Sequence, residues 1–358
     1  MSSIPHFRKV QHLPLEEQFM WQDRNRLALY AAMEASMRPV SVLDRLDVYS
    51  SPHTALRELF FVQNESGPDS ILCQRLPDGR VLEASLLVSG VVAAVNMMPF
   101  TRSEQIELGT SWSTPGNQSI AIVGFDHSSF ILATEAIANI RAMAQTHCPI
   151  GFKAEPCEIT LHDQTAIIAQ TPLGTARHKV APGKEQLPHS PFADPCGVMA
   201  RWCTREDLVP LESNHVDTYR ATPTNSGKYD YFRMTGEKVR YGEVVQLELG
   251  FQIIPQNGWL TMNIDLRSVS VVDSTCVSRL RNRIHAHTPT TTPPSELGIQ
   301  PTIIRKPRNA YIIASVERAK RAQEGRHHHD KAARVETSKA RTLRDALIFG
   351  RSPDEAAS

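Results

Sequence analysis

The strongest constraint on the fold is a stretch of alternating hydrophobicity on both sides of one tight turn. Apolar and polar residues alternate from Val245 to Ile253, and again from Leu260 to Leu266. The dipeptide Asn257-Gly258, which favours the two-residue turn of a β-hairpin, lies between the two stretches. Because a period of two marks a strand with one buried face, the sequence predicts an antiparallel hairpin here.

Two further features of this hairpin follow from its pattern. The apolar phase shifts at Arg267-Ser268 and continues through Val269 and Val271, which predicts a β-bulge. The polar positions are expected to face outward, and they are Gln246, Glu248, Gln252, Asp265 and the single cation Arg267. An OB-like barrel would bind single-stranded nucleic acid on such a face, but the scarcity of cations favours a scaffold role.

The rest of the body mixes helical and strand patterns. Residues 14–37 and 130–145 read as helices, the second capped by Ser128 or Ser129. Short strands are expected within 70–125 and 157–169. The predicted fold class is therefore α+β: a β-rich body of hairpins, open to barrel-like closure, with a few helices.

Proline-rich stretches divide the chain into expected regions. The divisions are an α+β region at 1–171, a loop with five prolines at 172–195, the hairpin region at 196–284, a Thr/Pro linker at 285–298 and a basic helical tail at 299–358.

Charge is distributed unevenly along the chain. The 358 residues carry 39 Lys and Arg against 38 Asp and Glu. Residues 301–358 hold 13 cationic and 7 acidic side chains, a net charge of +6, which leaves −5 on the remainder. A basic tail on a mildly acidic body indicates a polyanionic partner, of which nucleic acid is the usual one.

Nothing in the sequence predicts a secreted or membrane protein. The six cysteines form no CxxC pair, and the N-terminal segment has no apolar core of signal-peptide length. The longest apolar stretch, 81–98, is interrupted by polar residues and is interpreted as one or two buried strands. We expect an intracellular protein with no membrane partner.

The most informative segment opens the tail, IIRKPRNAYIIASVERAKRAQEGR at 303–326. Three cations flank Pro307, and an apolar group follows at Tyr311–Ile313. Cationic side chains neutralise phosphates and release counterions. An apolar side chain beside them can wedge between base steps in the minor groove and bend the duplex. The segment thus has the chemistry of a minor-groove binder.

This segment resembles the start of the HMG box, especially the fungal mating-type and Sox-like branch. The matching residues are Arg305, Lys306, Pro307, Asn309, Ala310, Tyr311 and Ile312. The resemblance covers about 20 of 358 residues, and it is partial: Ala314 stands where the family has a core aromatic, and no Trp follows Trp259.

The resemblance implies a nuclear transcription regulator that binds double-stranded DNA in the minor groove. Ile312 would be the wedge, Asn309 would contact a base or sugar, and Tyr311 would lie at the DNA-facing edge. The cations that would contact the DNA backbone, or extend that surface, are Arg305, Lys306, Arg308, Arg318, Lys320 and Arg321.

Two other function classes stay open on sequence grounds. The α+β body is either a protein-binding scaffold, with the tail as an accessory, or an enzyme of unknown class. No GxGxxG, P-loop, HExxH or GxSxG motif occurs, so no catalytic residue, metal ligand or cofactor is assigned. Asp126-His127-Ser128 is interpreted as a turn before a helix, and Cys196, Cys203 and His189 have no recognisable metal-site spacing.

Overall fold

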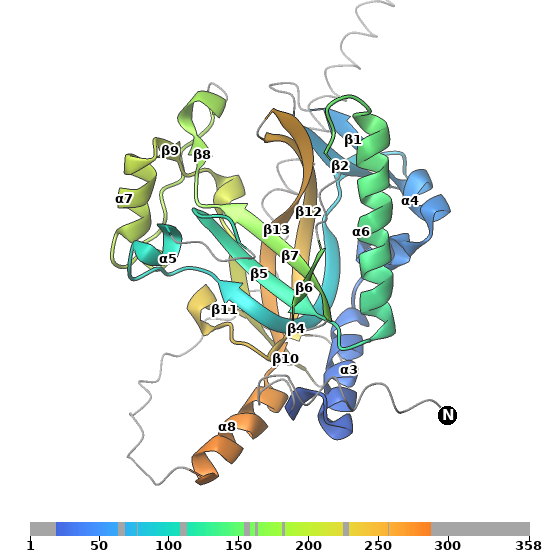
Figure 1. Ribbon diagram of the computed structural model, residues 1–358, viewed down its shortest axis with the longest axis vertical. Helices are drawn as coiled ribbons and strands as arrows, with labels where there is room; N and C mark the ends of the chain where they lie inside the picture. The colour runs from blue at the N-terminus through green and yellow to red at the C-terminus, as the bar shows by residue number, and fades with distance from the viewer. Residues whose placement is uncertain are drawn as a thin grey trace, which may run out of the picture.

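A computed structural model describes residues 19–63, 69–76, 78–107, 113–153, 158–161, 164–180, 183–224, 229–256 and 258–287. These residues form one large, strongly curved sheet with helices around it (Figure 1). The predicted mixed α+β body is therefore confirmed. Strands from 1–171 and from 196–284 join the same sheet.

Eleven strands make up the large sheet, in the order β11-β10-β13-β12-β4-β5-β7-β6, with β2 joining β12 and pairing with β1 and β3. The strands are β1 Leu59–Gln63, β2 Ser70–Arg75, β3 Val81–Glu83, β4 Leu86–Asn96, β5 Asn117–Val123, β6 Glu158–Leu161, β7 Gln164–Pro172, β10 Asp217–Pro223, β11 Tyr229–Arg233, β12 Val244–Gln256 and β13 Trp259–Asp273. A separate pair consists of β8 Thr175–Ala176 and β9 Leu208–Val209.

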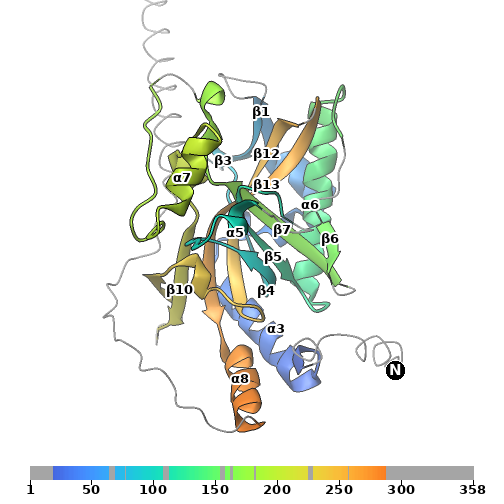
Figure 2. The ribbon, with the colours of Figure 1, turned by 60° about the vertical axis from the view of Figure 1, so that its left-hand side comes forward.

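The sheet curls until β7 approaches β13. The Thr171 hydroxyl donates a hydrogen bond of 2.7 Å to the carbonyl oxygen of Leu266. Strands β13, β12, β4, β5 and β7 thus bend round toward a barrel-like arrangement, seen from another side in Figure 2. All pairings in the large sheet are antiparallel except β10 with β13.

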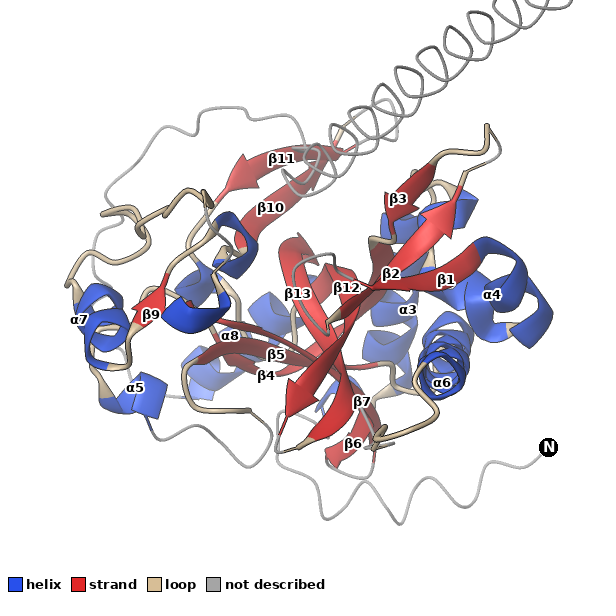
Figure 3. Ribbon diagram, turned by 90° about the horizontal axis from the view of Figure 1, so that it is seen from above, coloured by secondary structure: helices blue, strands red, loops and turns tan. Residues whose placement is uncertain are grey.

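The described α-helices surround this sheet. They are α3 Asp23–Met37, α4 Pro52–Glu58, α5 Glu104–Glu107, α6 Ser128–His147, α7 Val198–Arg205 and α8 Thr275–His287. Short 3-10 turns are η1 Val42–Asp44, η2 Leu46–Ser50, η3 Arg177–Lys179, η4 Glu212–Asn214 and η5 Gly236–Lys238. Figure 3 shows α4 and α6 beside β1 and β2, at the opposite end of the molecule from α5 and α7.

The predicted hairpin is confirmed as β12–β13. Gln256 pairs with Trp259, so two residues connect the strands, and Gly258 has φ 81° as such a turn requires. The predicted bulge is confirmed as well. Glu248 lies opposite Ser268 while Leu249 lies opposite Leu266, so Arg267 is the extra residue.

The polar face of this hairpin differs from the expectation. Gln246, Glu248, Asp265 and Arg267 are buried, and only Gln252 is half-buried, so the prediction of an outward face is wrong. The reason is that other segments cover this face and supply polar partners. The Gln246 Nε2 donates to the Ser36 carbonyl oxygen of α3 at 3.1 Å, and the Ser85 hydroxyl donates to Glu248 at 2.7 Å.

The predicted helix at 130–145 is confirmed as the longer α6. Its buried residues are Phe130, Ala133, Ala136, Ile137, Ile140 and Ala144. The N-cap is His127, so the expectation of Ser128 or Ser129 in that place is wrong. Position 124, just before the turn, requires glycine, because a Cβ there would lie 2.4 Å from the Phe130 ring. The predicted helix at 14–37 is confirmed for 23–37 as α3, but it is interrupted at Trp21 and Gln22, which are not helical. Residues 14–18 lie outside the described residues.

Candidate functional site

The residues predicted to contact DNA lie outside the described residues: Arg305, Lys306, Arg308, Asn309, Tyr311, Ile312, Arg318, Lys320 and Arg321. The same holds for the predicted linker beyond His287, where α8 ends. The described helix that precedes them is basic. Arg279 and Arg281 on α8 are exposed, and residues 275–287 contain no acidic side chain.

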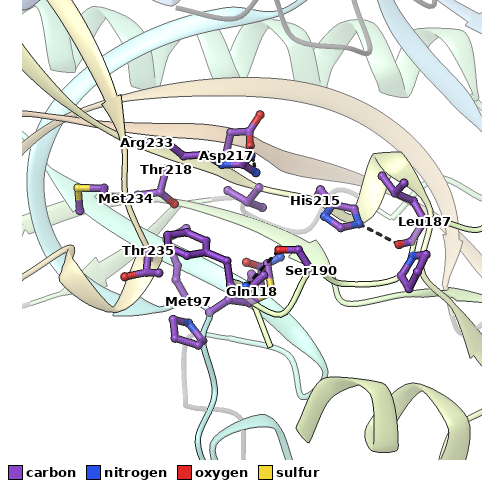
Figure 4. Close-up of a pocket in the computed structure, with 17 residues that line it drawn as sticks. Met97, Gln118, Leu187, Ser190, His215, Asp217, Thr218, Arg233, Met234 and Thr235 are labelled. Carbon is purple, nitrogen blue, oxygen red and sulfur yellow. Dashed lines mark hydrogen bonds and ion pairs between the residues drawn. The ribbon is translucent and has the colours of Figure 1, made fainter. Parts of the chain in front are cut away.

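One candidate site within the described body is a cavity of about 230 Å³ (Figure 4). Five segments line it: residues 97–99 after β4, Gln118 on β5, residues between 187 and 193, residues 215–218 at the start of β10, and residues 233–236 at the end of β11. Its lining mixes apolar side chains, such as those of Met97 and Met234, with polar ones, such as those of Gln118 and Asp217.

Gln118 is the most informative residue of this cavity. Its side chain is 0% exposed, and its Nε2 donates to the Asn214 carbonyl oxygen at 3.2 Å. A carbonyl oxygen only accepts, so this bond fixes which end of the amide is nitrogen. Among the described residues, none donates a hydrogen bond to the buried Oε1 at the other end of the amide. A buried acceptor left unsatisfied costs about 1–3 kcal/mol.

The remaining polar groups of the cavity are already engaged or electrically balanced. Arg233 forms an ion pair with Asp217 at 3.1 Å, and both side chains are partly exposed. The His215 Nε2 lies 3.1 Å from the Leu187 carbonyl oxygen, so this nitrogen carries the proton. Ser190 accepts a hydrogen bond from the Ala193 backbone amide at 3.2 Å. The cavity thus offers little net charge to a ligand.

A second imidazole lies beside this wall. His189 packs against His215 with ring centroids 5.0 Å apart, and its Nε2 is 3.0 Å from the Leu173 carbonyl oxygen. Burial lowers the pKa of His189, and the nearby His215 lowers it further. The His189 ring therefore favours its neutral form, and no residue in the described ranges forms a hydrogen bond with its buried Nδ1.

Cys203 lies on α7, where its thiol donates a weak hydrogen bond of 3.8 Å to the Leu173 carbonyl oxygen. Burial raises the pKa of the Cys203 thiol to about 11, so the thiol stays protonated and is a poor nucleophile. Among the described residues, no three His, Cys, Asp or Glu side chains are grouped closely enough to hold a metal ion.

The turn at Asp126-His127-Ser128 is confirmed as a turn before a helix. Phe125 and Asp126 both have positive φ, 49° and 64°. The Tyr30 hydroxyl donates to the Phe125 carbonyl oxygen, and His127 is buried against the Tyr30 ring with 4.9 Å between centroids. These contacts join α3 to the start of α6, which is a structural role.

Sequence reasoning missed the cavity because its lining comes from five distant segments. Gln118 falls within 70–125, where short strands are expected, and nothing in the pattern of that stretch distinguishes this glutamine. The single usable signal was the proline-rich stretch 172–195, which contributes Leu187–Ala193 to the cavity wall.

Comparison of the chain with protein-family models, with curated proteins and with solved structures gives no match in any of the three. None of the helices in the described ranges combines the length and the hydropathy needed to cross a membrane.

Proposed function

We propose that this chain is a nuclear DNA-binding regulator that contacts the minor groove through its basic C-terminal segment. The observation that carries the proposal is the separation of charge along the sequence: +6 on residues 301–358 and −5 on the rest. The partial HMG-box resemblance at 303–326 supports the choice of double-stranded DNA as the polyanion. In this proposal the β-rich body contacts a partner protein.

The basic helix α8 adds support from the described body. It follows β13 directly, and its exposed Arg279 and Arg281 are not offset by any acid within 275–287. Cationic side chains on the helix that precedes the tail extend the surface available to phosphates. Phosphate contacts of this kind provide affinity and orientation, whereas wedge and base contacts provide specificity.

Neutralising the motif cations is expected to weaken duplex binding and flatten its salt dependence. In the full-length variant Arg305→Gln/Lys306→Gln/Arg308→Gln, the slope of log K against log salt should fall by about 3, since each lost phosphate contact removes roughly one counterion. Fluorescence anisotropy with a short labelled duplex at several salt concentrations measures this slope.

A matched control separates the motif from general tail charge. The variant Lys331→Gln/Arg334→Gln/Lys339→Gln removes three cations from the same tail outside the motif, and it should bind with nearly the wild-type slope. Equal losses in the two variants would reject a localised site. Absence of duplex binding by the full chain at low salt would reject DNA binding altogether and leave the scaffold or enzyme alternatives.

The proposed wedge gives a separate prediction. Ile312→Ala should reduce DNA bending more than it reduces affinity, because the apolar side chain separates base steps while the cations hold the backbone. Energy transfer between dyes at the two ends of the duplex reports the bend, and anisotropy reports the affinity. Unchanged bending with weakened affinity would assign Ile312 to a packing role instead.

A further inference from the structure

We infer that residues 183–192 form a strap that His189 holds against the body, and that the strap detaches when the His189 imidazole takes up a proton. Part of the cavity wall comes from this strap, namely Leu187, Pro188, Ser190 and Phe192, so detachment at mildly acidic pH opens the cavity. The inference is independent of DNA binding, since the strap and the basic tail share no residue. Either proposal can therefore fail while the other stands.

The strap lies on the surface, and a single side chain of it points inward. Every residue of the strap is exposed except His189, which is half-buried. Residues 184–190 form neither helix nor strand. The large apolar side chains of Leu187 and Phe192 are 42% and 56% exposed, so apolar burial contributes little to holding the segment in place. Its attachment therefore depends on polar contacts.

Two imidazole rings supply polar contacts at the middle of the strap. The His189 Nε2 donates to the carbonyl oxygen of Leu173, just after β7, at 3.0 Å. In the other direction, the His215 Nε2 donates to the Leu187 carbonyl oxygen at 3.1 Å (Figure 4). The Leu187 amide in turn donates to the Pro210 carbonyl oxygen at 2.9 Å. The two rings pack with 5.0 Å between centroids, so the strap is attached through a pair of titratable groups.

The bond to Leu173 makes the neutral His189 ring the one that fits. A carbonyl oxygen only accepts, so Nε2 carries the proton of the neutral ring and Nδ1 carries none. Nδ1 is buried, and no residue in the described ranges offers it a hydrogen bond. Protonation would add a buried N–H group without an acceptor, and a positive charge beside the His215 ring. In the detached strap the same ring is in water, where it takes up the proton without these costs.

The groups that face His189 from the body favour the neutral ring on balance. Burial lowers the pKa of His189, and His215 lowers it further. The hydrogen bond to Leu173 and the Asp194 carboxylate raise this pKa, but their combined effect is smaller. The attached strap is therefore favoured above the ordinary imidazole value of about 6.5, and attachment is lost as the pH falls below it.

The remaining titratable groups nearby do not change this sign. The Cys203 thiol of α7 bonds to the same Leu173 carbonyl oxygen, and burial raises the pKa of this thiol to about 11, so it stays uncharged at the relevant pH. On the strap itself, Lys184 and Glu185 are exposed neighbours of opposite charge. His189 is thus the group whose protonation decides the attachment.

Hydrogen exchange at the Leu187 amide measures this attachment in the full-length protein, because the amide is bonded to Pro210 only while the strap is in place. Its protection factor, corrected for the intrinsic effect of pH on exchange, should fall about threefold or more between about pH 7.5 and 5.5, since uptake of one proton changes an equilibrium by at most about tenfold per pH unit. The Leu247 amide of β12, which pairs with β13 and β4, should keep its protection. A parallel loss at Leu247 would indicate global unfolding and overturn the inference.

Variants of one histidine at a time assign the proton uptake. His189→Gln keeps a neutral N–H donor for Leu173, so the protection of Leu187 should no longer fall with pH; His189→Phe is a second neutral replacement with the same expectation. A strap left unprotected at both pH values would also support His189 as its anchor. His178→Gln, the same change at an exposed histidine outside the strap, should keep the wild-type fall. Equal protection at the two pH values in the wild type, or a wild-type fall in either His189 variant, would overturn the inference.

Discussion

Replacing Arg267 by methionine is expected to lower the free energy of unfolding by about 3–5 kcal/mol, although the two side chains are similar in length. The Arg267 guanidinium lies 2.8 Å from a Glu83 oxygen and 3.2 Å from an Asp265 oxygen, and its side chain is only 4% exposed. Without this cation, two buried carboxylates would face each other's charge in a poorly solvated site. Urea unfolding of the full chain measures the change through the transition midpoint.

The surroundings of Arg267 explain why the loss should be large. Burial raises the pKa of the Asp265 carboxyl, although Arg267 and the Asn263 amide act in the opposite direction. The Asn263 Nδ2 donates to Asp265 at 2.6 Å. Gly250 on the neighbouring strand β12 leaves space for the guanidinium, because a Cβ at position 250 would lie 2.8 Å from the Arg267 Nε. The cluster is therefore built around this one cation.

Two further variants serve as controls for the Arg267→Met prediction. Arg80→Met breaks a surface ion pair with Asp78, in which both side chains are about half exposed, and it should cost about 1 kcal/mol or less. The combined variant Glu83→Gln/Asp265→Asn/Arg267→Met should recover much of the loss, because no buried charge is then left without its counterpart. If Arg267→Met lowered the free energy of unfolding by less than Arg80→Met does, the stabilising role of the buried cation would be contradicted.

Replacing Phe251 by alanine is expected to destabilise the protein by about 3–5 kcal/mol. Phe251 lies in β12 opposite Ile264, it is 0% exposed, and it belongs to the main hydrophobic core. Truncation removes the buried ring and leaves a cavity that tightly packed neighbours can close only in part. The urea midpoint again reports the change.

The same hairpin provides the control for Phe251. Trp259→Ala removes a larger aromatic side chain that is 54% exposed, and it should change stability by no more than about 0.5 kcal/mol. Phe251→Leu retains most of the buried volume, so its loss of stability should lie between those of Phe251→Ala and Trp259→Ala. Similar losses for Phe251→Ala and Trp259→Ala would mean that Phe251 does not contribute to the core as its burial indicates.

The local elements of the fold were largely predictable. The alternation through 245–266 identified β12 and β13, and the phase shift at Arg267 identified the bulge. The spacing of Ala133, Ile137 and Ile140 identified α6. These elements can be predicted because a strand or helix buries residues at a fixed spacing. The apolar residues of one face therefore recur at that spacing in the sequence. The N-cap of α6 was not predicted, since His127 is an uncommon residue in that position.

The candidate cavity shows the limit of the same reasoning. Gln118 and Asn214, joined by a hydrogen bond, are 96 positions apart, and no local period connects them. Gln118 lies in β5 and Asn214 in η4, at the end of the segment that follows β7. Their meeting depends on how that segment folds back over the end of the sheet.

The sequence by itself determined the hairpin, its bulge, the main helix and the concentration of positive charge after residue 300, because each is a property of neighbouring residues. Only the tertiary structure decided that Glu248, Asp265 and Arg267 are buried and that Gln118 bonds to Asn214 beside a cavity. The physical reason is that a strand has two faces, and its own pattern reports which one is apolar. Whether the polar face meets water or another segment depends on where distant elements such as α3 pack against the sheet.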